Sequence, residues 1–151
     1  MTTDFRALAD GLTAAVPLVK TFGMVYDEIS PTRAVVRLSD RPDLHNHVGG
    51  PHAGVMFALG ETASGAVVLA NFIDVMDRVT PLAAAADIAY VAVAKGDVTA
   101  TATLDIDRDE ILRQLDEGKT PKFVVSVVIS DAAGRPTGEM NVRWALRPNN
   151  R

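Results

Sequence analysis

The stretch HAGVMFALGETASGAVVLANFI, residues 52–73, is the longest apolar segment of the chain. Because its apolar side chains fall on nearly every side of a helix, it predicts one long buried helix rather than a surface helix. Gly54, Gly60 and Gly65 each cost a helix roughly 1 kcal/mol relative to alanine, so we expect close packing against a neighbouring sheet. Inside this helix Glu61 is the single ionisable residue before Asp74.

Outside this helix the chain has mostly the patterns of strands and turns. Alternating residues and turn signals predict six strands, near residues 22–30, 32–39, 82–94, 97–106, 122–131 and 137–147. Two more helices are predicted, an N-terminal one at about 3–16 and a short extra one at about 108–117. Strands that follow one another in this way favour an antiparallel sheet. We therefore expect an α+β fold, one antiparallel sheet wrapped around one long central helix, with residues 1–151 forming a single domain.

The composition excludes several classes of function. With 48% hydrophobic and 23% charged residues, the chain reads as an ordinary globular protein. A net charge of −4 gives no reason to expect nucleic acid or an anionic membrane as a partner. The absence of cysteine excludes disulfides, thiolate nucleophiles and zinc–thiolate sites. Charges interrupt residues 1–20, and no apolar run reaches the roughly 18 residues that span a bilayer, so we expect a cytoplasmic protein.

Glu61 is the first candidate for chemistry. A carboxylate in a buried helix loses its hydration, and burial raises its pKa. No Lys or Arg lies within two helical turns of it in the sequence. A buried acid without a partner is typical of functional sites, and this favours a catalytic carboxylate. The alternative is a structural carboxylate that reaches a helix end or a partner elsewhere in the fold.

The start of the same helix is the second candidate. The small residues Ala53 and Gly54 leave the N–H groups of the first turn open, and such groups stabilise a developing oxyanion. The side-chain amide of Asn46 could donate to the same oxygen. The alternative for Asn46 is a turn residue ahead of Gly49.

The spacing of the two candidates bears on assembly. Ala53 and Glu61 are eight residues apart, about 12 Å along a helix, which is too far for one carbonyl carbon to meet both. Two antiparallel helices across a two-fold axis would bring them together, each copy supplying half of two sites. The exposed edges of the sheet also favour self-association, so we expect a dimer or tetramer.

Three histidines, His45, His47 and His52, lie in the loop before the helix, together with Asp43. Without cysteine or a known metal motif this is weak evidence for a metal site, and we expect no bound metal. A histidine that hydrogen-bonds the backbone at the helix start is the preferred interpretation, with His52 orienting Asn46 or the first turn.

The loop and helix together resemble the signature of a known family. The matching positions are Asn46-x-x-Gly49-x-x-His52-Ala53-Gly54-x-x-Phe57-x-Leu59-Gly60-Glu61-x-Ala63-x-Gly65, which is similar to hotdog-fold thioesterases of the PaaI (phenylacetate-pathway) type. The turn Lys95-Gly96-Asp97 and the segment 130–144 resemble later parts of that fold, so that the likeness covers about residues 22–148.

This resemblance implies hydrolysis of an acyl-CoA thioester without cofactor or metal. It assigns Glu61 as general base or nucleophile, Asn46 as the family's asparagine, and the Ala53 N–H as the oxyanion donor where glycine is usual. A hydroxyl residue early in the next strand sometimes positions the water, and Thr80 is the nearest candidate. The diphosphate and 3′-phosphate of CoA need cations. The candidates are Arg33, Arg37, Arg78, Lys95, Lys119 and Lys122.

The chain departs from the family pattern at Glu61, where many relatives have Asp, and in the short extra helix. Two other functions therefore stay open: a hydroxyacyl-thioester dehydratase of the same fold, and a non-catalytic acyl-CoA binding module. The spacing of His52 and Glu61 does not match the dehydratase pattern. No basic or helix-turn-helix segment precedes residue 22, as a DNA-binding sensor would need. The identity of the acyl group stays open as well.

Overall fold

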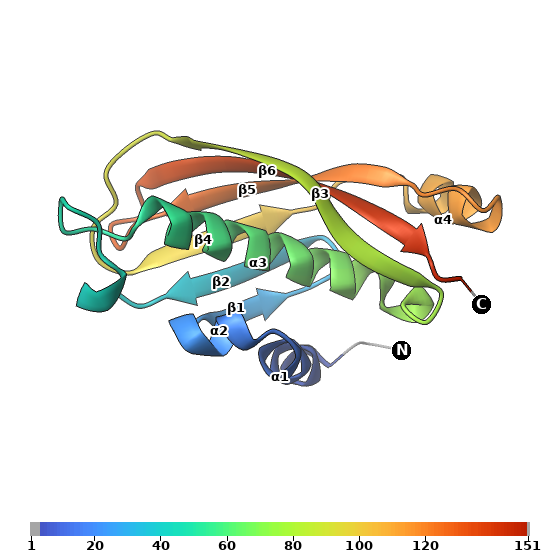
Figure 1. Cartoon of the computed structure of the whole chain (residues 1–151), viewed down its shortest axis with the longest axis horizontal. Coiled ribbons are helices and arrows are strands. Elements are labelled where there is room, and N and C mark those ends of the chain that lie inside the picture. The colour runs from blue at the N-terminus through green and yellow to red at the C-terminus, as the bar shows by residue number, and fades with distance from the viewer. Residues whose placement is uncertain (1–3, 151) are drawn as a thin grey trace.

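The central helix lies along one face of a single antiparallel sheet (Figure 1). The computed structural model describes residues 4–150. Its strands are β1 (Val25–Ile29), β2 (Arg33–Leu38), β3 (Val79–Tyr90), β4 (Val98–Thr103), β5 (Lys122–Ser130) and β6 (Pro136–Pro148), in the order β1-β2-β4-β5-β6-β3. Helix α3 (Ala53–Phe72) packs against β2, β4 and β5. This confirms the expected α+β architecture of one antiparallel sheet wrapped around one long helix.

The N-terminal region differs from the prediction. The helix expected at 3–16 is α1 (Phe5–Ala15), and residue 3 lies outside the described residues. A second helix that the sequence did not predict, α2 (Pro17–Phe22), begins at Pro17, because proline is favoured at the first position of a helix. Helix α2 ends at Gly23 with a φ of 69°, so β1 starts later than the expected residue 22.

The remaining elements follow the prediction within a few residues. The short helix α4 covers Arg108–Asp116, opened by the Asp107 side chain, which accepts a hydrogen bond from the Glu110 N–H. Ion pairs from Arg108 to Asp74 and from Arg78 to Asp116 join α4 to the segment after α3. Two 3₁₀ turns, Pro42–Leu44 and Ile73–Val75, flank the central helix.

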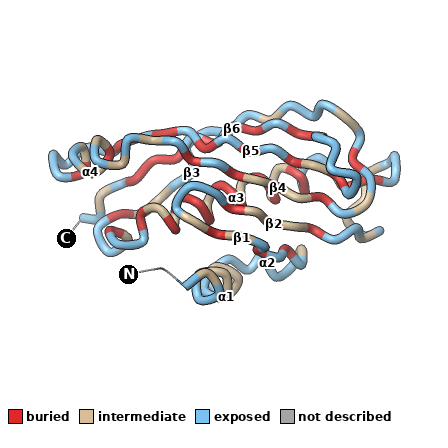
Figure 2. The backbone as a smooth tube through the Cα atoms, turned by 180° about the vertical axis from the view of Figure 1, so that it is seen from behind, coloured by how far each residue is buried: buried red, intermediate tan, exposed pale blue. Residues whose placement is uncertain are grey.

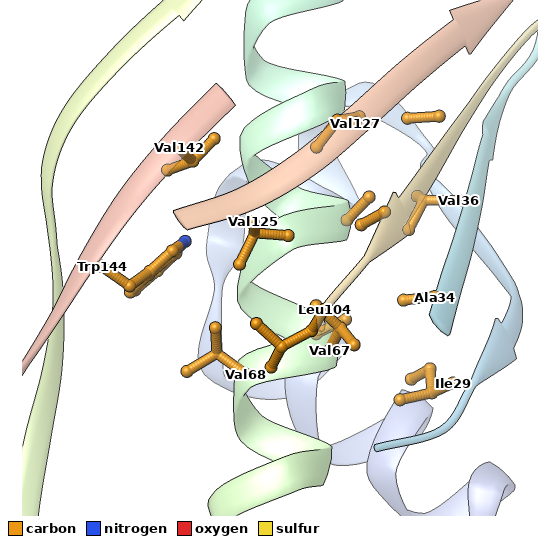
Figure 3. Close-up of a cluster of buried hydrophobic side chains, with 14 of the residues drawn as sticks. Ile29, Ala34, Val36, Val67, Val68, Leu104, Val125, Val127, Val142 and Trp144 are labelled. Carbon is orange, nitrogen blue, oxygen red and sulfur yellow. The ribbon is translucent and has the colours of Figure 1, made fainter. Parts of the chain in front are cut away.

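Helix α3 forms the centre of the core, and most of its residues are buried (Figure 2). Leu59, Val67 and Phe72 are fully buried. Figure 3 shows Val36 and Val125 of the sheet in the same buried cluster as Val67 of α3. The segment Ala53–Val75, with a mean hydropathy of 1.5, is long and apolar enough to cross a bilayer, which corrects the expectation that no such run exists. Because most of it is covered by the sheet, it is the core helix of a globular domain.

Two of the three helix glycines allow the close approach that the sequence predicted. A Cβ on Gly60 would lie 2.6 Å from the Met140 Sδ, and one on Gly65 would lie 3.4 Å from the Trp144 ring. At Gly54 the nearest neighbour is instead the His52 ring, 3.2 Å away. Gly60 and Gly65 therefore set the distance between α3 and β6.

Strand β3 forms one edge of the sheet and runs alongside α3 in the opposite direction (Figure 1). It pairs with β6 on one side, and within residues 4–150 no strand pairs with its other side. Most of its residues are exposed, including Leu82 and Tyr90, and so are Val91 and Val93 just beyond it. A long exposed apolar edge of this kind is a template for pairing with another strand.

Candidate active site

Glu61 lies in the third turn of α3 and opens into a groove of about 250 Å³. The groove is lined mainly by apolar side chains from α1, α3 and β6, and Tyr26 of β1 also faces it. Within the described residues the Glu61 carboxylate forms no hydrogen bond and no ion pair, whereas its backbone carbonyl accepts a hydrogen bond from the Ser64 hydroxyl. Burial raises the pKa of the Glu61 carboxyl above its ordinary value of 4.5.

Tyr26 is the groove residue that sequence patterns did not single out. Its side chain is 8% exposed, and its phenol has no hydrogen-bond partner among residues 4–150. Burial, with a smaller contribution from the negative charge of Glu61, raises the pKa of Tyr26 to about 12. A neutral O–H therefore faces the same space as the carboxylate. The alternation of buried and exposed residues along β1 is enough to predict that Tyr26 faces the inside of the protein. It is not enough to predict that Tyr26 lies beside Glu61.

A buried hydrogen-bonded pair supports the backbone at Glu61. The Trp144 Nε1–H donates to the Ser64 Oγ at 2.9 Å, and the Ser64 hydroxyl donates to the Glu61 carbonyl at 2.7 Å. Figure 3 shows the indole of Trp144 directed from β6 toward α3. These two bonds join the helix turn that carries Glu61 to the sheet.

Removing the Ser64 hydroxyl is expected to destabilise the fold. In Ser64→Ala the Trp144 N–H stays buried without an acceptor, which costs about 1–3 kcal/mol of unfolding free energy. Urea unfolding measures this loss, and Ser64→Ala combined with Trp144→Phe should lose less than the two single changes together, because they remove one interaction. An unchanged urea midpoint for Ser64→Ala would contradict the coupling.

The start of α3 offers one open N–H group. The His52 side chain caps the helix, its Nδ1 accepting a hydrogen bond from the Gly54 N–H at 2.9 Å. The Gly54 N–H is therefore occupied, whereas the Ala53 N–H has no acceptor within residues 4–150. On the other side of this turn, the Tyr90 hydroxyl donates to the Ala53 carbonyl at 2.8 Å. Of the two predicted oxyanion donors, the geometry favours Ala53.

Asn46 organises the loop ahead of the helix. Its Oδ1 accepts hydrogen bonds from the Val48 N–H at 3.0 Å and the Gly50 N–H at 3.2 Å, and its Nδ2 reaches the Pro51 carbonyl at 3.4 Å. Gly50 is required here, because a Cβ would lie 2.6 Å from the Ala94 carbonyl oxygen. Asn46 thus has the turn role of the alternative interpretation. It also lines the pocket beside Ala53, and one of its two amide hydrogens has no acceptor among residues 4–150.

The structure brings some predicted residues together and separates others. Asn46 and Ala53 line one pocket of about 300 Å³, with the residues that follow β3 on its other side. Glu61 lines the other groove, beside Pro81 at the start of β3. Ala53 and Glu61 are eight residues apart on α3, about 12 Å along its axis. Within one chain, Ala53 and Glu61 therefore line different pockets.

Thr80 does not line the groove. Its hydroxyl donates to the Asn149 Oδ1 at 2.6 Å, which fixes the start of β3 to the C-terminal residues. Neighbouring residues of a strand point to opposite sides, and Pro81 is the one that faces Glu61.

The loop histidines have separate contacts. The His45 Nε2 lies 2.6 Å from the Asp40 Oδ1, His52 caps α3, and His47 is exposed. Among the residues that the structure describes, no three His, Asp or Glu side chains gather in a way that could hold a metal ion.

Comparisons with known proteins bear on both fold and family. Residues 5–146 match the domain of unknown function DUF4442, and no curated protein matches the chain. The protein AziG of S. sahachiroi is 29% identical over 88% of this chain and 98% of its own, with a TM-score of 0.71.

Two further solved structures are more distant in sequence and show the fold alone. A Pseudomonas aeruginosa protein of unknown function, named a probable thioesterase, is 22% identical over 99% of both chains, with a TM-score of 0.86. A thioesterase family protein from Silicibacter pomeroyi is 14% identical, covering 97% of this chain and 100% of its own, with a TM-score of 0.78. The chain therefore belongs to the DUF4442 family, and it has the same hotdog fold as these two solved structures.

Proposed function

We propose that this protein hydrolyses an acyl-CoA thioester to the free acid and CoA, with Glu61 as the general base. The observation that carries the proposal is a buried carboxylate without a protein partner that opens into an apolar groove. Such a group costs stability in the folded state, and carboxylates with a raised pKa are characteristic of general bases. The thioesterase names of two similar structures agree with hydrolysis of a thioester.

The proposed step uses water and two groups of the protein. Glu61 removes a proton from water while the water oxygen forms a bond to the thioester carbonyl carbon. The carbonyl oxygen becomes an oxyanion that accepts a hydrogen bond from the Ala53 N–H, with the Asn46 amide as a second donor. The C–S bond then breaks, and the proton passes from Glu61 to the CoA sulfur. No step requires a metal or a cofactor.

We infer that two copies share this site. Strand β3 runs from Pro81, beside the Glu61 groove, to Tyr90, beside the helix start. Antiparallel pairing of β3 with a second β3, centred between Ala85 and Ala86, places Tyr90 of one copy opposite Pro81 of the other. The Glu61 groove of one copy then faces the Ala53 pocket of the next, and the two-fold axis makes two such sites.

Among the six cations predicted for the CoA phosphates, Lys95 fits best. Arg33, Arg37, Arg78 and Lys119 are paired with acids, namely Glu28, Asp27, Asp116 and Glu117 in that order. Within the described residues Lys95 and Lys122 form no ion pair, and Lys95 directly follows Ala94, which lines the pocket beside Ala53. We propose that the Lys95 ammonium binds a phosphate of CoA. We also propose that the protein acts on its substrate in the cytoplasm.

The proposed function is tested by thiol release from acetyl-, octanoyl-, palmitoyl- and phenylacetyl-CoA. Turnover of at least one thioester supports hydrolysis. Conversion of a hydroxyacyl-CoA to the enoyl product without thiol release would make the protein a dehydratase instead. Binding of acyl-CoA without any turnover would indicate that the protein is a non-catalytic acyl-CoA binding module. His52 makes the dehydratase less favourable, since its ring caps the helix start two turns away from Glu61.

A further inference from the structure

The groove at Glu61 has a shape that bears on the acyl group. Three of its lining residues, Glu61, Gly65 and Leu69, lie at successive four-residue steps along one face of α3. Eight residues of helix extend about 12 Å, so the groove runs for roughly that length away from the carboxylate. Leu12 of α1 and Val16, the residue that follows α1, line it as well.

The length of the groove limits what fits. An extended chain of tetrahedral atoms advances roughly 1.2 Å per bond, as the extended polypeptide backbone does. About 12 Å of groove beyond the carboxylate therefore accommodates a straight chain of about eight to ten carbons.

The middle of the groove depends on one glycine. Gly65 lies one turn beyond Glu61, and its backbone faces the groove because it has no side chain. A Cβ there would already lie 3.4 Å from the Trp144 Cζ2, so a longer side chain at this position must extend along or across the groove. Beyond Glu61 the lining carries few polar groups, the hydroxyls of Tyr26 and Thr62 among them. The lining therefore suits an apolar chain rather than a polar acyl group.

Helix α1 closes the groove without belonging to the core. None of its residues is fully buried: Leu12 is partly exposed, and Val16, which follows the helix, is exposed. We propose that the substrate is a straight-chain acyl thioester of about eight carbons, whose chain lies along α3 from Glu61 to Leu69 beneath α1. Gly65 keeps the groove open, and Leu12 and Val16 set its width. This inference rests on the proposed function for the thioester, but the chain site itself can be tested without turnover.

Trp144 gives a direct readout of the groove, because it is the single tryptophan of the chain and lines this groove. Titration of the wild-type protein with primary alkanols, from 1-butanol to 1-dodecanol, should change its fluorescence emission. Affinity should rise about fourfold with each buried methylene and level off near 1-octanol. A continued rise to 1-dodecanol, tighter binding of 2-phenylethanol than of 1-octanol, or no change in emission would overturn the inference.

Two variants test the residues. Gly65→Leu should lower kcat/KM for octanoyl-CoA about 100-fold relative to acetyl-CoA, and should weaken 1-octanol binding at least tenfold. If Gly65→Leu does not fold against Trp144, Leu12→Trp on the partly exposed α1 should give the same selective loss of octanoyl-CoA turnover. Leu18→Trp, on α2 and outside the groove, is the matched control and should leave the ratio unchanged. Equal effects on both thioesters would contradict the assignment of Gly65 and Leu12.

These results separate the inference from the proposed function. In one outcome, no thioester is hydrolysed, but 1-octanol binds with the expected plateau and Gly65→Leu abolishes that binding. The proposed hydrolysis is then wrong, and the proposed binding site for the acyl chain is supported. In the opposite outcome, thioesters are hydrolysed and the rates do not depend on Gly65 or Leu12. The proposed hydrolysis is then supported, and the proposed binding site for the acyl chain is wrong.

Discussion

Glu61→Gln is expected to lower kcat at least about 100-fold while making the folded protein more stable at pH 7. The loss of turnover follows because glutamine cannot accept the proton from water, and general bases contribute about 10²–10⁴-fold. Thiol release and circular dichroism on the same sample measure the two effects. Glu61→Asp keeps a carboxylate one methylene shorter and serves as the matched control, with activity between those of Glu61→Gln and the wild type. Turnover within tenfold of the wild type in folded Glu61→Gln would remove Glu61 from the mechanism.

The gain in stability has a defined pH dependence. The pKa of Glu61 is raised by burial in the folded protein above the ordinary value of 4.5 that it keeps in the unfolded chain. Between these two pKa values the folded state binds more protons than the unfolded state, so the wild type loses stability as pH rises through this window. Glutamine does not titrate. The unfolding free energy of Glu61→Gln should therefore exceed that of the wild type at pH 7, and the difference should disappear below pH 4.5.

The raised pKa of Glu61 also predicts how kcat/KM depends on pH on the acidic side of its optimum. Glu61 must be ionised to act as a base, so kcat/KM should fall as pH drops through a pKa higher than 4.5. A limb at or below 4.5 would show that an ordinary exposed carboxylate, and not Glu61, controls the reaction.

Ala53→Pro is expected to keep the fold and lower kcat by about 10²–10³-fold, the usual cost of one oxyanion donor. Proline has no N–H, and Ala53 is the first residue of α3, where proline is tolerated. The preceding residue must be extended, and His52 has φ −60° and ψ 142°, which satisfies this condition. Ala53→Gly keeps the N–H and is the matched control, with turnover close to that of the wild type. A folded Ala53→Pro with normal kcat would exclude this N–H as the donor.

The two variants together test whether the site is shared. In a mixed dimer of Glu61→Gln and Ala53→Pro, one of the two sites combines the intact Glu61 of one copy with the intact Ala53 N–H of the other. Random mixing should therefore restore about a quarter of wild-type activity, because half of the dimers are mixed and each has one intact site. A mixture as inactive as its parents would place both groups in a single protomer.

The sequence predicted what depends on local patterns. The buried helix, Glu61 as its single internal acid and the close packing at Gly60 and Gly65 all follow from residue type and spacing along one element. Helix α2 was missed because Pro17 serves equally as the end of one helix and the start of another. The sequence offered Ala53 and Gly54 as oxyanion donors, and only the structure distinguishes them. The His52 ring accepts a hydrogen bond from the Gly54 N–H, so the Ala53 N–H is the one that stays open.

Contacts between distant elements were beyond prediction. Trp144 and Ser64 are 80 positions apart, and their hydrogen bond follows from the register of β6 against α3. The proximity of Tyr26 to Glu61 likewise requires β1 to lie at one particular height beside the helix. Periodicity places a residue on a face of its own element, but the packing of elements decides which residues meet.

The pairing of β3 also determines when the sheet can be completed during synthesis of the chain. Strand β3 is the third strand to leave the ribosome, yet within the described residues its sheet partner is the last one, with Val79 opposite Pro148 and Tyr90 opposite Gly138. Until the final residues of β6 emerge, β3 has nothing to pair with, and both site halves lack the strand that lies beside them. Such long-range pairing slows folding and leaves an unpaired strand available for wrong contacts. Within the described residues, β3 therefore gains its sheet partner only after β6 has been synthesised.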